Sequence, residues 1–438
     1  MAKYKAYSEY RDSGVEWLGE IPKHWNTKRL GQFFEERREK VSDKNYPALS
    51  VTMQGIVPQL DTAAKTEAGD NRKLVLKNDF VINSRSDRKG SAGTSQFDGS
   101  VSLISIVMRP KNINVNFAHH LLRSYPFQEE FYRNGKGIVA DLWSTNSSEM
   151  KNILLPEIPD RESQIIANFL GHETAKIDNL IEKQQQLIEL LKEKRQAVIS
   201  HAVTKGLNPD VPMKNSGIEW LDRIPSLWKV IPTYSICIPT TYKNSRGSEQ
   251  NVLSLSHGKI IKRNIESNFG LLPESFNTYQ TIDKGDIILR LTDLQNDKNS
   301  LRVGLVKERG IITSAYLNIN PGRYLSSSHL YYLLYSYDVM KVFYGMGGGL
   351  RQSMKFEDLR RLPLLIPSVE EQGIIVKYLD KLTDKIDTLI EKQLQQITLL
   401  KERRTALISA TVTGKIDVRN WVAPTPETET HPEAEASA

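Results

Sequence analysis

The sequence has only one cysteine, Cys237, among 438 residues. A single thiol excludes an internal disulfide framework and a zinc site built on several thiolates, and it indicates a reducing compartment. No stretch approaches the roughly 18 apolar residues that a membrane span requires, and the first residues lack the apolar segment of a secretory signal. We therefore expect a cytoplasmic protein with no membrane segment.

Signatures of familiar catalytic chemistry are missing as well. The chain contains no GxxxxGK[ST] phosphate loop, no HExxH, no GxSxG and no CxxC. Cys237 has no histidine or cysteine close to it in the sequence and is interpreted as a small core residue. We predict no catalytic residue, no metal site and no cofactor bound by this chain.

What the chain does have is an excess of positive charge in its body. The formal net charge is +7, and the four glutamates of residues 423–438 conceal a net charge of +11 on residues 1–422. A basic body favours polyanionic partners, nucleic acid first. The acidic end is rich in Pro, Glu, Thr and Ala, which is typical of a disordered tail.

The chain also repeats itself. SGVEWLGEIPKHW (13–25) returns as SGIEWLDRIPSLW (216–228), with eight of thirteen residues identical, and LLRSYPFQEEFYRNGKG (121–137) returns in part as LLYSYDVMKVFYGMGGG (333–349). The closest match lies between residues 165–204 and 374–413, where 24 of 40 residues coincide. His119 and His120 match Tyr331 and Tyr332, so we interpret the histidines as structural residues of a helix. The protein is two copies of one unit of about 200 residues, each a globular region followed by a long helical segment.

The two helical segments carry equivalent apolar stripes. Hydrophobic residues recur at alternating three- and four-residue spacing, the pattern of an amphipathic helix that pairs with another. Because the first helix carries the chain away from the first globular region and the second must return, we expect antiparallel pairing in a coiled coil. The predicted pairing residues are Leu170, Ile177, Ile181, Ile188, Leu191, Val198, Leu379, Ile386, Ile390, Ile397, Leu400 and Leu407.

The globular regions are predicted to be mixed α/β, because short apolar runs such as VSLISIVM (101–108) resemble strands and Leu-rich pieces resemble helices. The predicted fold class is α/β, with two such domains separated by the antiparallel helices and related by an approximate twofold axis. The expected domains are 1–158, a helical spacer at 159–206, 207–367, a second spacer at 368–414, and a tail at 415–438. Aligning Pro159 with Pro367 leaves Gly373 as an extra residue in the second copy.

Polar and basic runs lie between the strand-like segments, where loops can reach outward. Arg, Lys, Asn, Gln, Ser and Thr are the residues that hydrogen-bond phosphates and base edges. These loops differ between the copies while the surrounding frame matches, which suggests two readers of different nucleotide sequences. A single charged loop residue can equally be solvated without any ligand. The candidate DNA-binding residues are Thr52, Gln54, Arg72, Lys73, Arg85, Arg88, Lys89, Lys243, Arg246, His257, Lys259, Arg263, Arg290, Thr292, Gln295, Asn296 and Arg302.

The duplicated frame resembles the specificity subunits of type I restriction-modification systems. The motifs that carry this resemblance are KIDNLIEKQ (176–184) and KIDTLIEKQ (385–393), the P-x(4)-Q segments at Pro159 and Pro367, the SG[VI]EWL motifs, and VTGKIDVR (412–419). They span nearly the whole chain except the acidic tail.

The resemblance implies two target-recognition domains that each read half of a bipartite, asymmetric sequence in double-stranded DNA, with the paired helices setting the gap. It also implies partners: two modification subunits that bind S-adenosylmethionine and methylate adenine N6, and restriction subunits that use ATP and Mg2+. Two alternatives stay open, a two-headed structural adaptor that binds proteins only and an autonomous nuclease or methyltransferase, the latter disfavoured by the missing motifs.

Overall fold

A computed structural model describes residues 4–60, 69–137, 143–263, 275–294, 297, 301–346 and 353–424. The chain divides into two compact units. Unit 1 comprises Met1–Gln184 and Gln395–Ala438, and unit 2 comprises Gln185–Leu394. Each unit therefore combines a globular region with one half of each long helix, α5 (Asp160–Lys205) and α8 (Val369–Val412).

The long helices begin in the same way in both copies. The first helical hydrogen bonds run from Ser163 to Pro159 and from Gln372 to Ser368. In the first turn of each helix, a glutamate accepts a hydrogen bond from the second tryptophan of the repeated motif: Trp25 Nε1 lies 3.1 Å from Glu162, and Trp228 Nε1 lies 3.0 Å from Glu371.

These bonds make Glu162 equivalent to Glu371 and Pro159 equivalent to Ser368. The extra residue of the second copy therefore lies before the helix, and the prediction that Gly373 is the insertion was wrong. Ser368 Oγ accepts a hydrogen bond from the backbone of Glu371, so the second copy begins its helix with a serine cap that proline cannot supply.

Unit 1 packs a four-stranded sheet of order β10-β9-β12-β4, a three-stranded sheet of order β11-β8-β5, and three two-stranded ribbons. Its strands are β1 (Tyr10–Asp12), β2 (Glu20–Pro22), β3 (Asn26–Arg29), β4 (Phe34–Glu36), β5 (Lys40–Val41), β6 (Leu49–Thr52), β7 (Gly55–Pro58), β8 (Arg72–Val75), β9 (Phe80–Asn83), β10 (Ala92–Thr94), β11 (Gly99–Val101), β12 (Ser105–Pro110) and β13 (Leu154–Glu157). Its short helices are α1 (Leu30–Phe33), η1 (Ser86–Arg88), α2 (Val115–Arg123), α3 (Tyr125–Arg133) and α4 (Ser147–Asn152).

Unit 2 repeats this arrangement strand for strand. In the direction that matches unit 1, its four-stranded sheet has the order β23-β22-β25-β17, and its three-stranded sheet has the order β24-β21-β18. Its strands are β14 (Met213–Ile218), β15 (Leu221–Pro225), β16 (Lys229–Pro232), β17 (Cys237–Thr240), β18 (Tyr242–Lys243), β19 (Leu253–Ser256), β20 (Lys259–Lys262), β21 (Gln280–Ile282), β22 (Ile287–Leu289), β23 (Val303–Leu305), β24 (Gly310–Ile312), β25 (Leu317–Pro321) and β26 (Pro363–Ile366). Its short helices are η3 (Thr233–Ser235), α6 (Ser327–Val339), η4 (Val342–Gly345) and α7 (Phe356–Leu359).

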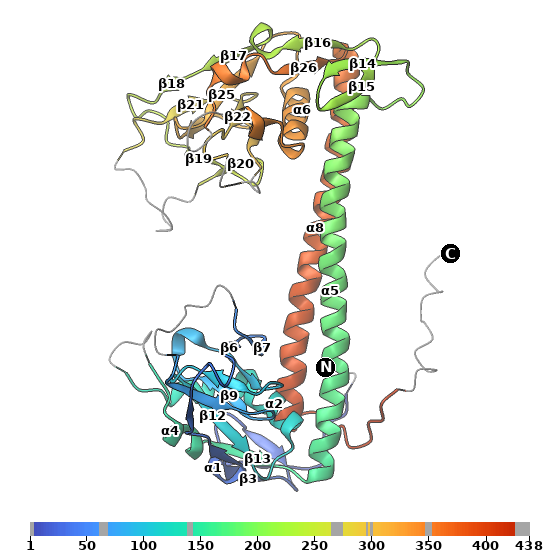
Figure 1. Ribbon diagram of the computed structural model, residues 1–438. Helices are drawn as coiled ribbons and strands as arrows, with labels where there is room; N and C mark the ends of the chain where they lie inside the picture. The colour runs from blue at the N-terminus through green and yellow to red at the C-terminus, as the bar shows by residue number, and fades with distance from the viewer. Residues whose placement is uncertain are drawn as a thin grey trace. The chain divides into compact units, whose positions relative to one another are not determined.

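Each core lies between the four-stranded sheet and the long helices. In unit 1 it joins Phe80 of β9 and Phe117 of α2 to Leu170 of α5 and Leu407 of α8. In unit 2, α6 lies against the half-helices (Figure 1), and its Leu330 shares a core with Leu379. The mixed α/β class and the internal duplication are confirmed.

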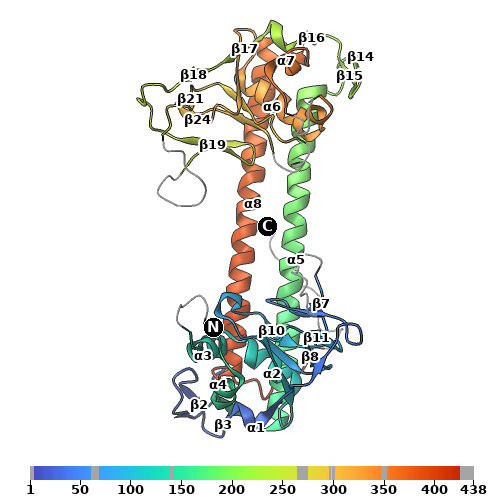
Figure 2. The same cartoon turned by 60° about the vertical axis from the view of Figure 1, so that its left-hand side comes forward.

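Within each unit the two half-helices run antiparallel. In unit 1 Arg404 bonds Asp178 at 2.8 Å, while Trp421, further along the chain, contacts Phe169, which lies further back. In unit 2 Arg195 bonds Asp387 at 3.0 Å, and the end of α5 at Gly206 lies beside Glu371 at the start of α8. Figure 2 shows the two helices side by side in a second view of each unit.

The apolar stripes lie on the paired faces. Seven of the predicted pairing residues are buried, Leu170, Ile177, Ile188, Leu379, Ile386, Ile397 and Leu407, and five are half-buried, Ile181, Leu191, Val198, Ile390 and Leu400. Removing these side chains from water supplies most of the stability of such helices. None of the helices in the described ranges is both long and apolar enough to cross a membrane.

Candidate nucleic-acid interface

In unit 1, the turn of the β6–β7 hairpin projects polar and apolar side chains together. Thr52 Oγ1 donates to the Gly55 carbonyl at 2.9 Å and accepts a hydrogen bond from the Gln54 backbone at 3.1 Å. Gly55 closes the turn with φ 125°, a value that side chains disfavour. Gln54 is exposed and Met53 is 71% exposed, so the tip of the turn is available to a ligand.

The loop between β9 and β10, residues 84–91, lies directly beside that turn. A Cβ atom on Gly90 would stand 3.6 Å from Met53 Cε, and Arg123 of α2 donates to the Met53 carbonyl at 2.7 Å. Arg85, Arg88 and Lys89 of this loop are exposed. We call residues 52–55 and 84–91 the unit 1 loop pair, and it brings together Thr52, Gln54, Arg85, Arg88 and Lys89.

Two predicted contacts of unit 1 lie elsewhere, on β8. Arg72 is buried and donates to the Ser100 hydroxyl at 2.8 Å and to the Ser100 carbonyl at 3.0 Å, so its prediction as a DNA contact was wrong. Lys73 is half-buried, and its ammonium donates to the Ser105 carbonyl at 2.7 Å. Burial lowers the pKa of Lys73, and this side chain links strands within the fold.

In unit 2, the β19–β20 hairpin occupies the equivalent position. His257 and Gly258 both have positive φ angles, 47° and 73°, which form the tight two-residue turn that matches strand twist. Tyr331 of α6 donates to the Gly258 carbonyl at 3.2 Å. His257 is exposed, whereas the exposed Lys259 ammonium bonds Asp387 of α8 at 2.9 Å. Arg263, half-buried, follows at the end of β20.

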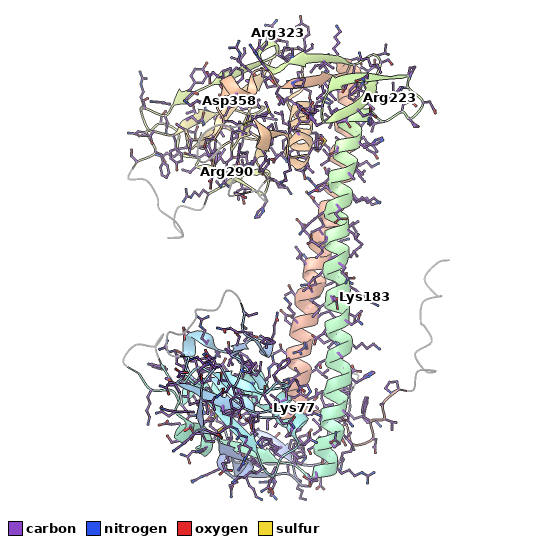
Figure 3. The ribbon with its side chains drawn as sticks, viewed as in Figure 1. Lys77, Lys183, Arg223, Arg290, Arg323 and Asp358 are labelled. Carbon is purple, nitrogen blue, oxygen red and sulfur yellow. The ribbon has the colours of Figure 1, made fainter. Side chains whose placement is uncertain are left out.

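Residues 290–302 join β22 to β23, and the end of this loop lies beside the turn, because a Cβ atom on Gly258 would stand 3.2 Å from Leu301. Arg290, labelled in Figure 3 on the same side of unit 2 as the hairpin, pairs with Asp297 at 3.3 Å, and Thr292 is half-buried. We call residues 256–259, together with the described loop residues 290–294, 297, 301 and 302, the unit 2 loop pair. Gln295 and Asn296, also predicted contacts, lie outside the described residues.

Arg302 is fully buried, and its guanidinium donates to carbonyl oxygens of its own loop. Its prediction as a DNA contact was therefore wrong. Lys243 and Arg246 are exposed, but Lys243 ends the edge strand β18 and Arg246 lies in the following turn. That sheet is separate from the one that leads into Arg290, so the two cations are not part of the unit 2 loop pair.

His119, His120 and Arg123 of α2 are half-buried, and Arg123 bonds both the unit 1 turn and the His119 ring. Burial, reinforced by Arg123, lowers the pKa of His119 to about 3, and burial, reinforced by Arg404, lowers that of His120 to about 4. Both imidazoles are neutral near pH 7 as a result.

In unit 2, burial raises the pKa of the Cys237 thiol to about 12, which makes the thiol a poor nucleophile.

Sequence reasoning missed Met53 and Arg123. Met53 was passed over because an apolar residue inside a polar run carries no charge signal, although its place between Thr52 and Gln54 is the tip of the turn. Arg123 belongs to a helix, and only the fold brings its guanidinium to the turn carbonyl. Across the described ranges, no group of three or more His, Cys, Asp or Glu side chains is placed to hold a metal ion.

Comparison with known proteins gives this surface a context. Residues 258–399 match the family model described as type I restriction modification DNA specificity domain. This match begins at the turn of the β19–β20 hairpin and ends within α8. This part of the chain is therefore similar to a type I DNA specificity domain.

Relatives of the specificity domain extend the match over most of the chain. The MjaX type I restriction enzyme specificity subunit assigned in Methanocaldococcus jannaschii is 23% identical over 431 residues, covering 92% of this chain and 96% of that protein. The EcoBI specificity subunit of Escherichia coli is 25% identical over 302 residues, covering 64% of this chain and 62% of that protein. The resemblance to type I specificity subunits is confirmed.

A solved structure supports the fold of the specificity domain and its twin. It comes from work on complex assembly and conformational transition of the type I R-M system, and it aligns with a TM-score of 0.66 at 14% identity. The alignment covers 90% of this chain and 99% of that one. At this level of identity the likeness concerns the fold alone.

Proposed function

We propose that this chain is the DNA-recognition subunit of a type I restriction-modification complex. Each unit reads one half of a bipartite, asymmetric target through its loop pair. The observation that carries the proposal is that both units present a hairpin turn and the loop after the equivalent strand, β9 or β22, at the same topological position but with different residues. A constant frame with variable polar loops suits two readers of different base sequences.

In this proposal the chain supplies the address and its partners supply the chemistry. Two modification subunits bind S-adenosylmethionine and methylate adenine N6, and restriction subunits use ATP and Mg2+ to translocate and cleave DNA, all in the cytoplasm. A base must leave the stack before it can be methylated. Two loop pairs on either side of the gap would hold the duplex while that happens.

Salt titration of the assembled complex tests the proposal. With its modification subunits, the chain should bind duplex DNA carrying its target, with affinity falling by orders of magnitude between about 50 and 200 mM salt. The double variant Arg88→Ala, Lys89→Ala should weaken binding to all sequences and reduce the salt slope by about two.

Lys77→Ala is the matched control, because Lys77 is an exposed cation at the opposite end of β9 from the 84–91 loop. It should leave the salt slope almost unchanged. If the assembled complex binds no DNA at any salt concentration, the chain is instead a protein adaptor. If the complex does bind DNA, mapping methylated adenines in a genome that carries the chain and its partners would define the two half-sites.

A further inference from the structure

One tyrosine occupies the same place in both copies of the repeat. Tyr132 and Tyr344 each follow a phenylalanine and stand eleven residues after the paired leucines at Leu121 and Leu333. Tyr132 lies near the end of α3 and Tyr344 lies in η4, the element that follows α6. Neither residue is part of a loop pair.

In unit 1 the Tyr132 hydroxyl contacts the backbone of the 84–91 loop and of the strand residue before it. It donates to the Asn83 carbonyl at 3.0 Å, where the loop leaves β9, and lies 3.5 Å from the Arg88 carbonyl inside the loop. The side chain is buried, and burial raises the pKa of Tyr132, so the hydroxyl keeps its proton. The exposed side chains of Arg88 and Lys89 thus stand on a backbone anchored from the core.

In unit 2 the Tyr344 hydroxyl reaches the equivalent loop. It donates to the Asp297 carbonyl at 3.3 Å and accepts a hydrogen bond from Arg302 Nε at 3.1 Å. The Arg302 guanidinium, 5.4 Å from the centre of the Tyr344 ring, then bonds the carbonyls of Arg290 at 3.1 Å and Thr292 at 2.9 Å. Further bonds reach the carbonyls of Asp293, at 3.3 Å, and Asp297.

The difference between the copies follows from loop length. The unit 1 loop has eight residues between β9 and β10, and the unit 2 loop has thirteen between β22 and β23. One hydroxyl spans the shorter loop. The longer loop has more carbonyls to hold, and a guanidinium with five fixed donors extends the reach of the tyrosine.

These bonds differ from those of an ordinary buried tyrosine. The Tyr337 hydroxyl, in the last turn of α6, donates at 2.9 Å to the carbonyl of Pro363, which belongs to β26. That bond joins two regular elements. The bonds of Tyr132 and Tyr344 join a repeated Phe-Tyr position to a loop whose sequence the two copies do not share.

We propose that Tyr132 and Tyr344 are equivalent positioning residues, each fixing the backbone of one DNA-reading loop so that its side chains meet the bases in one geometry. The inference rests on the proposed function, since it assigns the loops a target. Each tyrosine governs discrimination at one half-site only, and Arg302 is the second part of the brace in unit 2.

The test measures methyl transfer by the assembled complex on duplexes with single base changes in either half-site, after the wild-type target has been mapped. Tyr132→Phe should lose roughly two- to tenfold in discrimination at the half-site read by unit 1, the range of one hydrogen bond. Tyr344→Phe should do the same at the other half-site. In each variant the untouched half-site keeps its wild-type discrimination.

Tyr337→Phe is the matched control, because it removes a buried hydroxyl that donates to a carbonyl outside the loops. It should lower the melting temperature about as much as Tyr344→Phe and leave discrimination at both half-sites intact. The inference is overturned if Tyr132→Phe or Tyr344→Phe keeps full discrimination, alters both half-sites, or behaves like Tyr337→Phe. A wild-type complex without a defined methylation target would instead overturn the proposed function.

Discussion

Burial separates the cations that can meet a ligand from those that hold the fold. Arg88 and Lys89 have exposed side chains, although the Lys89 ammonium also pairs with Glu129 of α3, whereas the guanidinium groups of Arg72 and Arg302 are buried and donate to backbone and hydroxyl oxygens. Arg72 could have been recognised from the sequence, because it shares a strand face with the buried Leu74. Arg302 could not, because nothing in its flanking residues shows that a loop folds back over it.

The half-buried His119 and His120 make the stability of the chain depend on pH. His119 and His120 have pKa values of about 3 and 4 when folded, against 6.5 when unfolded. Below about pH 6.5 these two imidazoles are protonated in the unfolded chain but not in the folded chain. The free energy of unfolding therefore falls as the pH drops from about 6.5 towards 4.

The double variant His119→Asn, His120→Gln should reduce this loss. Below pH 6 the slope of unfolding free energy against pH should decrease by up to about two protons. Denaturant unfolding between pH 7.5 and 4.5 measures it. His329 of unit 2, whose pKa burial lowers to about 4, stays in place as an internal reference. An unchanged slope would show that the two imidazoles are not the source.

At the scale of elements, the duplication places an equivalent ion pair between the two half-helices of each unit, and the partners are exchanged between the copies. Moving 17 residues forward on α5, from Asp178 to Arg195, corresponds to moving 17 back on α8, from Arg404 to Asp387. In each unit the aspartate of one copy bonds the arginine of the other. The repeated KID and KE[KR]R motifs therefore set the register of the antiparallel helices.

The two ion pairs should differ in strength. Arg195 is largely buried and also donates to the Tyr335 hydroxyl at 3.2 Å, whereas the Arg404–Asp178 pair is more exposed. Arg195→Ala should cost about 1.5–3 kcal/mol of unfolding free energy. Arg404→Ala, the matched control, should cost less than about 1 kcal/mol. Denaturant unfolding measures both, and equal losses would show that burial does not strengthen the pair.

At the scale of the whole molecule, α5 and α8 are each continuous through both units. The proposed role of the helices as the element that sets the gap between half-sites follows from this continuity. Helix α5 begins in unit 1 and ends in unit 2, and α8 begins in unit 2 and ends in unit 1, so neither unit contains a complete long helix.

Inserting four residues into both helices at the division between the units, after Gln184 and before Gln395, tests that role. Four helical residues add about 6 Å, close to two base pairs. The methylated targets should keep both half-sites and gain roughly two unspecified base pairs between them. Mapping methylated adenines measures the gap, and an unaltered gap would remove the helices from that role.

The sequence by itself determined the duplication, the long amphipathic helices and the positions of the variable loops, because these follow from periodicity and self-similarity along the chain. Only the tertiary structure decided which loop cations are exposed and which core groups hold the loops. The Tyr132 and Tyr344 hydroxyls bond carbonyls 49 and 47 residues away along the chain, and such a separation leaves no local sequence pattern. The exposure of a loop cation and the hydrogen bonds that hold a loop both depend on contacts between segments that are distant in the sequence, and only the folded chain brings these segments together.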